Sequence, residues 1–311
     1  MPHSLFYEFT AGTMKKQHLK FRIDEEMFRC PLCKSSMNVT DAGSLVCGSG
    51  HCFDISSKGY VNFLPNSKQS KCYDEVFFEN RRKIFGYGLY RHVADEIAAL
   101  VSLYPQKPLN IADAGCGEGY YSLDIADKFS DSGNSIFALD FSRDGIQLAS
   151  KGGNDVKWLV SDLSNIPLRD GGVNIVLNIF SPANYAEFRR VLKVGGALIK
   201  VVPGENHMTE IRQIVSEQTS GNVTKEYSNR QVVDVFERNF AIRERIRVTR
   251  AFDVTEDMRE AVINMTPLTF GIGGDDDESP EESKKISFGG LDRITVDAEI
   301  LISYKDNETT E

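Results

Sequence analysis

The chain has 311 residues, of which 41% are hydrophobic and 26% charged, and its formal net charge at pH 7 is −9. This length accommodates one core of about 200 residues and a smaller appended unit. No stretch approaches the roughly 18–20 apolar residues that cross a bilayer, and the first 29 residues lack the apolar segment of a secretion signal, so we expect a cytoplasmic protein without a membrane span.

The acidity is concentrated near the carboxyl terminus. Residues 271–311 carry 12 Asp/Glu against 4 Lys/Arg, whereas residues 1–90 carry 12 Lys/Arg against 9 Asp/Glu. Phosphate binding depends largely on Lys and Arg, so the net charge alone would argue against a nucleic-acid partner. The uneven distribution weakens that objection.

A cluster of cysteines follows an amino-terminal extension over residues 1–29. Four ligand-type residues form two close pairs, Cys30 with Cys33 and Cys47 with His51. Such pairs match the tetrahedral coordination of structural zinc, and a metal explains the clustering better than disulfides do in a reducing compartment. Cys52 is adjacent to His51, so either of the two could be the fourth ligand. We predict a zinc-binding ribbon over residues 30–70.

Residues 71–108 are predicted to form a helical linker region. Residues 66–72 are polar, which indicates a boundary near residue 70. From Asp74 to Leu103 the apolar residues recur at helical spacing, interrupted around Gly86 and Gly88. We therefore expect one or two helices there.

Residues 109–311 alternate short β-rich runs with helical stretches, which is typical of βαβ units around a parallel sheet. Two later β-rich runs would complete the sheet as an antiparallel edge. The seven predicted strands are 109–114, 135–140, 156–160, 173–180, 197–202, 241–252 and 294–304. The fold class is thus α/β with a Rossmann-like sheet. Residues 271–285 are glycine-rich and acidic, and we expect a mobile loop there.

A glycine turn ends the first of these strands. Asp113 precedes Gly115, Gly117 and Gly119, and a helical run follows. Glycines at this spacing let the backbone bend sharply and let a ligand approach closely. The turn is tighter than the Gly-x-Gly-x-x-Gly dinucleotide fingerprint, which places a pyrophosphate at a helix amino terminus. It therefore favours a neutral or cationic nucleoside.

Two further acids follow the next two strands. Asp140 ends the second strand, where its carboxylate can accept hydrogen bonds from both ribose hydroxyls, and Asp162 follows the third, where it can accept one from the adenine amino group. The alternative is that the glycines form only a tight turn and the acids only cap helices. The ordered set of three strand-end features favours the nucleoside pocket.

The substrate is expected beside the fourth strand, where the chain reads NIFSPAN. No cysteine lies next to Pro182, which argues against covalent attack on a pyrimidine ring. The segment also differs from the Asn-Pro-Pro-aromatic motif expected of enzymes that modify exocyclic amines. A ring nitrogen remains as the acceptor, and Phe180 or Tyr185 could stack on the base that carries it. His207 follows the fifth strand, where a capping role is the plainer alternative.

Basic residues mark candidate phosphate contacts. Arg81 and Arg82, followed by Lys83, lie on the predicted helix, where a solvated face is an equally good interpretation. Four arginines alternate on a later strand and could simply pair with neighbouring acids: Arg243, Arg245, Arg247 and Arg250.

Between residues 28 and 270 the chain resembles the RlmA-type (RrmA) 23S rRNA guanine-N1 methyltransferases, including the tylosin-resistance branch. The resemblance is carried by the segments FRCPLC, CGSGHCFDISSKGYVNFLP, RRKIFGYGLY, DAGCGEGYY, ALDFS, FRRVLKVGG and PGENHMTEI. It departs from the family before Cys30, around Asp275, at Phe180, where tyrosine is expected, and near Met265.

This resemblance implies a seven-strand class I methyltransferase that moves a methyl group from S-adenosylmethionine to N1 of a guanine in a hairpin of 23S rRNA. It also implies a structural Zn²⁺ on Cys30, Cys33, Cys47 and His51. The cofactor residues that it implies are Tyr90, Gly117, Glu118 and His207. A carboxylate, a histidine or a water chain could accept the N1 proton, and no catalytic residue is assigned.

The partner that we expect is 23S rRNA, and we allow for a homodimer. Two alternatives remain. One is a methyltransferase that acts on a small molecule or a protein, and the other is a noncatalytic zinc-ribbon protein that binds RNA. The intact glycine turn and Asp140 argue against the second alternative.

Overall fold

The computed structural model describes residues 15–70, 72–105, 107–152, 154–218, 227–269 and 287–306. The expected acidic loop at 271–285 lies outside the described residues, as do residues 1–14 of the predicted extension. Within the described ranges no helix is long and apolar enough to cross a membrane.

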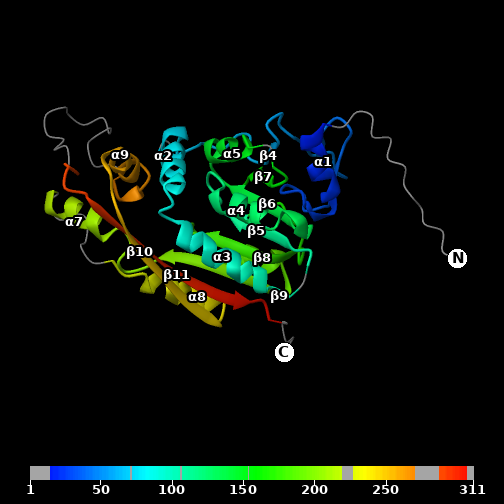
Figure 1. Ribbon diagram of the computed structural model, residues 1–311. Helices are drawn as coiled ribbons and strands as arrows, with labels where there is room; N and C mark the ends of the chain where they lie inside the picture. Colours follow the sequence, from blue (N-terminus) through cyan, green and yellow to red (C-terminus); the bar gives the residue numbers. More distant parts are fainter. Residues whose placement is uncertain are drawn as a thin grey trace.

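A mixed eight-stranded sheet forms the centre of the molecule, in the order β10-β11-β9-β8-β5-β6-β7-β4 (Figure 1). Seven of its strands are those predicted: β5 (Asn110–Ala114), β6 (Ser135–Asp140), β7 (Lys157–Val160), β8 (Val173–Ile179), β9 (Leu192–Pro203), β10 (Glu244–Asp253) and β11 (Arg293–Tyr304). Strands β5 to β9 are parallel, and β10 and β11 form the expected antiparallel edge. The Rossmann-like α/β fold is therefore confirmed.

The eighth strand, β4 (Tyr60–Asn62), comes from the segment assigned to the zinc ribbon. It pairs in parallel with β7, with Val61 opposite Leu159. Three residues are too few for alternation of apolar and polar side chains to be detected in the sequence, which explains why this strand was not predicted. The ribbon thus contributes directly to the main sheet.

Helices connect the strands along the chain and pack on the sheet. Their bounds are α2 (Glu75–Gly86), α3 (Arg91–Leu103), α4 (Tyr120–Lys128), α5 (Arg143–Ser150), α6 (Tyr185–Val191), α7 (Thr209–Gln218), α8 (Arg230–Asn239) and α9 (Glu256–Asn264), with short 3₁₀ turns at Ser130–Ser132 and Pro267–Thr269. The side chain of Asp74 caps α2 by accepting the N–H of Phe77. The predicted interruption is confirmed, because Gly88 lies between α2 and α3 with φ +81°.

The strands bury apolar side chains on both faces, so the sheet separates two cores. In β6, Ile136 and Ala138 point into one core and Phe137 and Leu139 into the other. Helices α3, α4, α5, α7 and α9 contribute to the first core. The ribbon, α6 and α8 contribute to the second.

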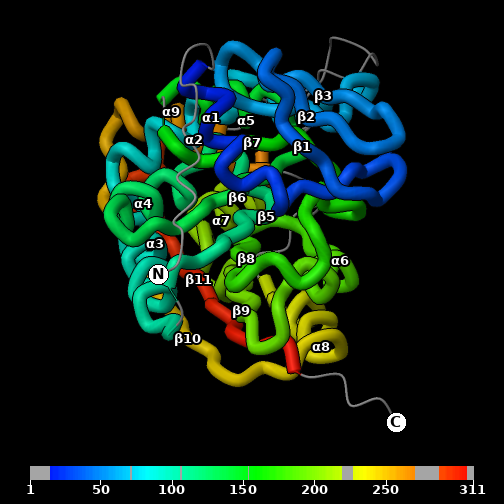
Figure 2. The backbone as a smooth tube through the Cα atoms, turned by 90° about the vertical axis from the view of Figure 1, so that its right-hand side faces the viewer, coloured from blue at the N-terminus to red at the C-terminus, as the bar shows by residue number. Residues whose placement is uncertain are grey.

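The ribbon is a small antiparallel sheet of β1 (Met37–Val39), β2 (Ser44–Cys47) and β3 (Cys52–Asp54), preceded by α1 (Lys16–Ile23) and a 3₁₀ turn at Glu25–Met27. It lies against the β7 side of the large sheet (Figure 2). The Phe28 ring packs edge-on against Phe137 at 5.8 Å. Buried Lys157 is ion-paired with Asp24. The division of the chain near residue 70 stays a prediction, but these contacts run across it.

Candidate functional site

The four predicted metal ligands converge in the ribbon. Their ligand atoms all lie within 4.8 Å of one another. Sγ of Cys33 lies 3.5 Å from Sγ of Cys47, and Nδ1 of His51 lies 3.5 Å from Sγ of Cys30 and 3.4 Å from Sγ of Cys47. Tetrahedral zinc with Zn–S bonds of about 2.3 Å places sulfur atoms roughly 3.8 Å apart, so the residues fit this ion.

The surroundings favour His51 over Cys52 as the fourth ligand. Cys52 is exposed and directs its thiol toward Asp54. The Ser35 hydroxyl, 3.1 Å from Sγ of Cys33, lowers the pKa of that thiol to about 5. A thiolate is the form that binds zinc, so the lowered pKa of Cys33 favours the binding form of that ligand at neutral pH, whereas burial raises the pKa of the Cys30 thiol.

The glycine turn joins β5 to α4 with all three glycines at positive φ, +89° for Gly115, +56° for Gly117 and +82° for Gly119. The three have different surroundings. A Cβ at Gly115 would collide with the side chain of Ser181, whereas one at Gly119 would collide with the buried ring of Trp158. Gly115 and Gly117 line a cavity, and Gly119 is required by packing.

This cavity has a volume of about 510 Å³ and lies over the carboxyl ends of β5, β6 and β7. The predicted residues that line it are Arg81, Gly115, Gly117, Asp140, Asp162, Phe180 and Pro182. The Asp140 carboxylate accepts the N–H of Gly117 at 2.8 Å and of Ser142 at 2.7 Å. Each carboxylate oxygen has a second lone pair for a ligand hydroxyl.

Two other predicted acids are not among the residues that line this cavity. Asp113 is buried and accepts the Ser122 hydroxyl at 2.6 Å, and burial raises its pKa to about 7. Glu118 is also buried, and it accepts a hydrogen bond from Nε of Arg81 at 3.0 Å. Both acids therefore support the turn that carries the cavity wall.

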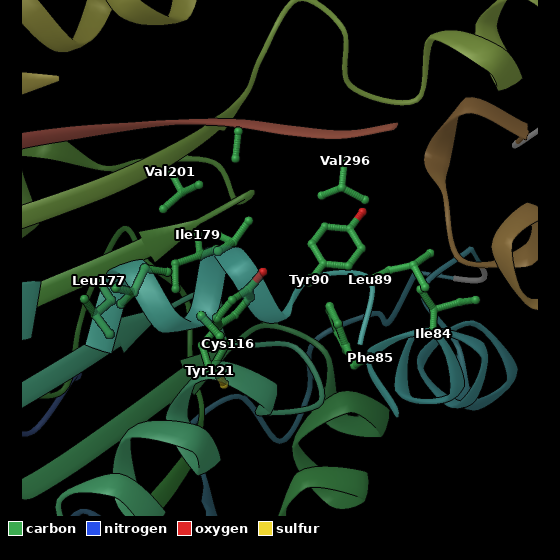
Figure 3. Close-up of a cluster of buried hydrophobic side chains, with 14 of the residues drawn as sticks. Ile84, Phe85, Leu89, Tyr90, Cys116, Tyr121, Leu177, Ile179, Val201 and Val296 are labelled. Atoms are coloured by element: carbon green, nitrogen blue, oxygen red, sulfur yellow. The ribbon is translucent and has the colours of Figure 1, made fainter. Parts of the chain in front are cut away.

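Tyr90 and His207 form an aromatic cluster with Phe180. Figure 3 shows Tyr90 in the buried cluster beside Phe85, and their ring centroids are 5.1 Å apart. The rings of Phe180 and His207 stack at 5.4 Å. Burial lowers the pKa of His207 to about 4, and its Nδ1 accepts the N–H of Asp297 at 3.3 Å. The His207 ring is thus neutral, with its proton on Nε2, and it packs against the ring of Phe180.

The loop at Phe180–Pro182 is held by two buried polar residues that the sequence analysis did not identify. Nζ of Lys200 donates to Oδ1 of Asn178 at 2.6 Å and to the Ser181 carbonyl at 3.0 Å. Nδ2 of Asn178 donates to the Ala114 and Pro182 carbonyls at 2.7 and 3.0 Å. A lysine within the apolar run ALIKVV was a signal for such a network. Phe180 itself is held at φ +49°, which is unusual for an aromatic residue.

A second hollow, of about 440 Å³, lies on the other side of this loop. It shares Phe180, Ser181 and Pro182 with the first cavity and is completed by Tyr185 and by α8. The loop therefore separates two neighbouring spaces along the carboxyl edge of the sheet.

The linker also contributes residues that were not predicted. Ser70 and Tyr73 line the first cavity, together with Phe77 and Phe78 of α2. The ribbon is thus connected to the core by a segment that forms part of the cavity wall.

Arg81 and Arg82 do not share a surface. Arg81 faces the cavity, whereas Arg82 is exposed. The helical period explains the difference, because Arg81 lies four residues from both Phe77 and Phe85, which are buried. Three of the four later arginines pair with acids, as the simpler interpretation held: Arg243 with Asp306, Arg245 with Glu299 and Arg247 with Asp297. The fourth, Arg250, lies over the ring of Phe252 at 5.3 Å.

Comparisons with known proteins agree with this geometry. A family model described as "RlmA, N-terminal" matches residues 28–71, and one described as "Methyltransferase domain" matches residues 111–196. The sheet, the glycine turn and these matches define the class of protein, an S-adenosylmethionine-dependent methyltransferase with a zinc ribbon.

The relatives narrow the class. The chain is 37% identical over 294 residues to a Bacillus subtilis protein, YxjB, that is named as a 23S rRNA (guanine-N1)-methyltransferase, and the match covers 92% of this chain and 100% of that protein. It is 29% identical to the 23S rRNA (guanine(748)-N1)-methyltransferase of Streptomyces fradiae, over 59% of this chain and 65% of that protein. The chain belongs to the 23S rRNA (guanine-N1)-methyltransferase family, which confirms the resemblance seen in the sequence.

Proposed function

We propose that this chain transfers the methyl group of S-adenosylmethionine to N1 of a guanine in a hairpin of 23S rRNA, in the cytoplasm. The observation that carries the proposal is the cavity in which the glycine turn, Asp140 and Asp162 meet the Phe180–Pro182 loop. Membership of the family supports the choice of rRNA as the substrate. The homodimer that we allowed for stays a prediction.

The cavity walls suit the parts of this cofactor. In the proposed complex, Asp140 accepts the ribose hydroxyls, Asp162 accepts the adenine amino group, and the bare backbone at Gly115 and Gly117 lets the ligand lie close to the turn. S-adenosylmethionine bound in this way would supply an activated methyl group. Transfer would form the N1–C bond and break the S–C bond, with the electron pair left on sulfur and the N1 proton passed to a carboxylate, a histidine or a water chain. The protein then needs alignment rather than a nucleophile.

The loop at Phe180–Pro182 is the proposed meeting point of cofactor and base. N1 lies on the pairing edge of guanine, so the base has to be unpaired or turned out of its stack to react. Phe180 lines both hollows and is supported by His207 and Tyr90, so its ring can serve as a firm stacking surface. The buried hydrogen bonds of Lys200 and Asn178 would keep this surface in place.

The test is to detect the modification and then to restore it. Deletion of the gene should remove one N1-methylguanosine from 23S rRNA, seen as the loss of a reverse-transcription stop and of the methylated nucleoside by mass spectrometry. The purified protein with S-adenosylmethionine should restore both signals on rRNA from the deletion strain. An unchanged stop pattern after deletion, with no methyl transfer to that rRNA in vitro, would exclude the proposed substrate.

A further inference from the structure

Both negatively and positively charged side chains line the cavity. In the described part of the chain they are Asp140, Asp162 and Arg81. The two acids have ligand groups assigned to them in the proposed function. Arg81, the one cation of the three, has none.

Arg81 is fixed in a defined orientation. Its Nε donates to Glu118, whose side chain is only 2% exposed, at 3.0 Å. Its guanidinium carbon lies 5.8 Å from the centre of the Phe77 ring and 5.1 Å from that of Phe85. An ion pair on one edge and aromatic rings beside the plane restrict the motion of the group.

The ion pair leaves part of the guanidinium for a ligand. Within the described residues, the hydrogen bond to Glu118 uses Nε, so the edge formed by the two terminal nitrogens stays open. The side chain keeps 23% of its surface exposed while it lines the cavity. Two parallel N–H groups on one edge of a guanidinium match the two oxygens of a carboxylate.

S-adenosylmethionine carries one group that needs such a partner. Its sulfonium and ammonium groups are cations, which the acids of the cavity attract, and its α-carboxylate is an anion, which the same acids repel. We infer that Arg81 binds the α-carboxylate of the methionyl part of S-adenosylmethionine. The inference rests on the proposed function, since it presumes that this cofactor occupies the cavity.

The role assigned to Arg81 is one of binding. The α-carboxylate takes no part in the bond changes and is present in both the cofactor and its demethylated product. Arg81 therefore stabilises the reactant and product complexes alike, and its loss should raise the Kd of both.

The test compares two ligands on matched variants. Calorimetry on the full chain would measure the Kd of S-adenosylmethionine and of its decarboxylated analogue, which keeps the adenosine, the sulfonium and the amine. Arg81→Met should raise the Kd of S-adenosylmethionine by roughly 10–100-fold, the range for hydrogen bonds to a charged group. It should change the Kd of the analogue by less than about twofold. Arg91→Met is the control, because Arg91 is also paired with carboxylates, Asp95 and Asp124, but does not line the cavity.

Each outcome has a distinct meaning. Equal weakening of both ligands by Arg81→Met, or weakening of neither, overturns the inference while leaving the proposed function in place. A wild-type protein that binds neither ligand overturns the proposed function itself. If the unpaired buried Glu118 makes Arg81→Met too unstable to purify, the double variant R81M/E118Q removes that charge and is judged by the same ratio of ligand affinities.

Discussion

Replacement of Asp140 by alanine should weaken S-adenosylmethionine binding by at least roughly 100-fold. Asp140 ends β6 at the cavity, and its two oxygens already hold the N–H groups of Gly117 and Ser142. In the proposed complex it also accepts two ribose hydroxyls. The substitution therefore removes both the ligand contacts and the anchor that positions the glycine turn.

The magnitude follows from the number of hydrogen bonds lost. A hydrogen bond to a charged group contributes about 1.5–3 kcal/mol, so two ribose contacts contribute about 3–6 kcal/mol. Each 1.4 kcal/mol changes the Kd about tenfold, which gives a factor of roughly 100 at the lower limit. Loosening of the Gly117 turn can only add to this loss.

Calorimetry and thermal denaturation of the same samples would measure the effect. Asp131→Ala serves as the matched control, because Asp131 is an exposed acid in the 3₁₀ turn Ser130–Ser132, just before the opposite end of β6. The control should bind like the wild type, and both variants should remain folded. An Asp140→Ala protein that binds with unaltered affinity would show that the ribose is held elsewhere.

Three further predictions concern the ribbon, the buried acid and the loop. Cys30→Ser should lower the Tm, because the metal site stabilises a module that packs on the main sheet; a Tm equal to that of the zinc-loaded wild type would contradict this. Asp113→Asn should gain stability relative to the wild type as the pH rises from about 4 to 7, since the unfolded carboxyl ionises across this range while the folded one, with its pKa raised to about 7, keeps its proton; parallel pH profiles in denaturant titrations would refute it. Lys200→Met should slow single-turnover methyl transfer by about 10-fold or more with little change in cofactor Kd, because the Ser181 carbonyl loses a charged donor; a changed Kd at an unchanged rate would place the role of Lys200 elsewhere.

The residues at the strand ends were the most predictable part of the site. Gly115, Asp140 and Asp162 each follow a parallel strand, and the carboxyl ends of parallel strands meet at one edge of the sheet whatever the details of packing. The structure brings all three to one cavity. Cys30, Cys33 and Cys47 were equally predictable from their spacing, whereas the choice of His51 over Cys52 required the structure.

Residues that depend on side-chain direction or on distant pairing were harder to predict. The placement of Arg81 in the cavity follows from its helical register with Phe77 and Phe85, but that register becomes decisive only once the buried face of α2 is known. The partnership of Lys200 with Asn178 joins two strands whose order in the sheet no local pattern reveals. Tyr73 was assigned to a linker region. It lines the cavity because the segment between β4 and α2 forms part of the cavity wall.

Strand β4 has a consequence for any attempt to study the catalytic part alone. Removal of the first 70 residues would remove the strand that pairs with β7 on one side. The N–H and C=O groups of Trp158–Val160 that point toward β4 would then lose their partners. Uncovered edges of this kind recruit strands from other molecules. A truncated chain should thus self-associate rather than behave as a smaller enzyme, so the amino-terminal portion protects the edge of the main sheet from aggregation.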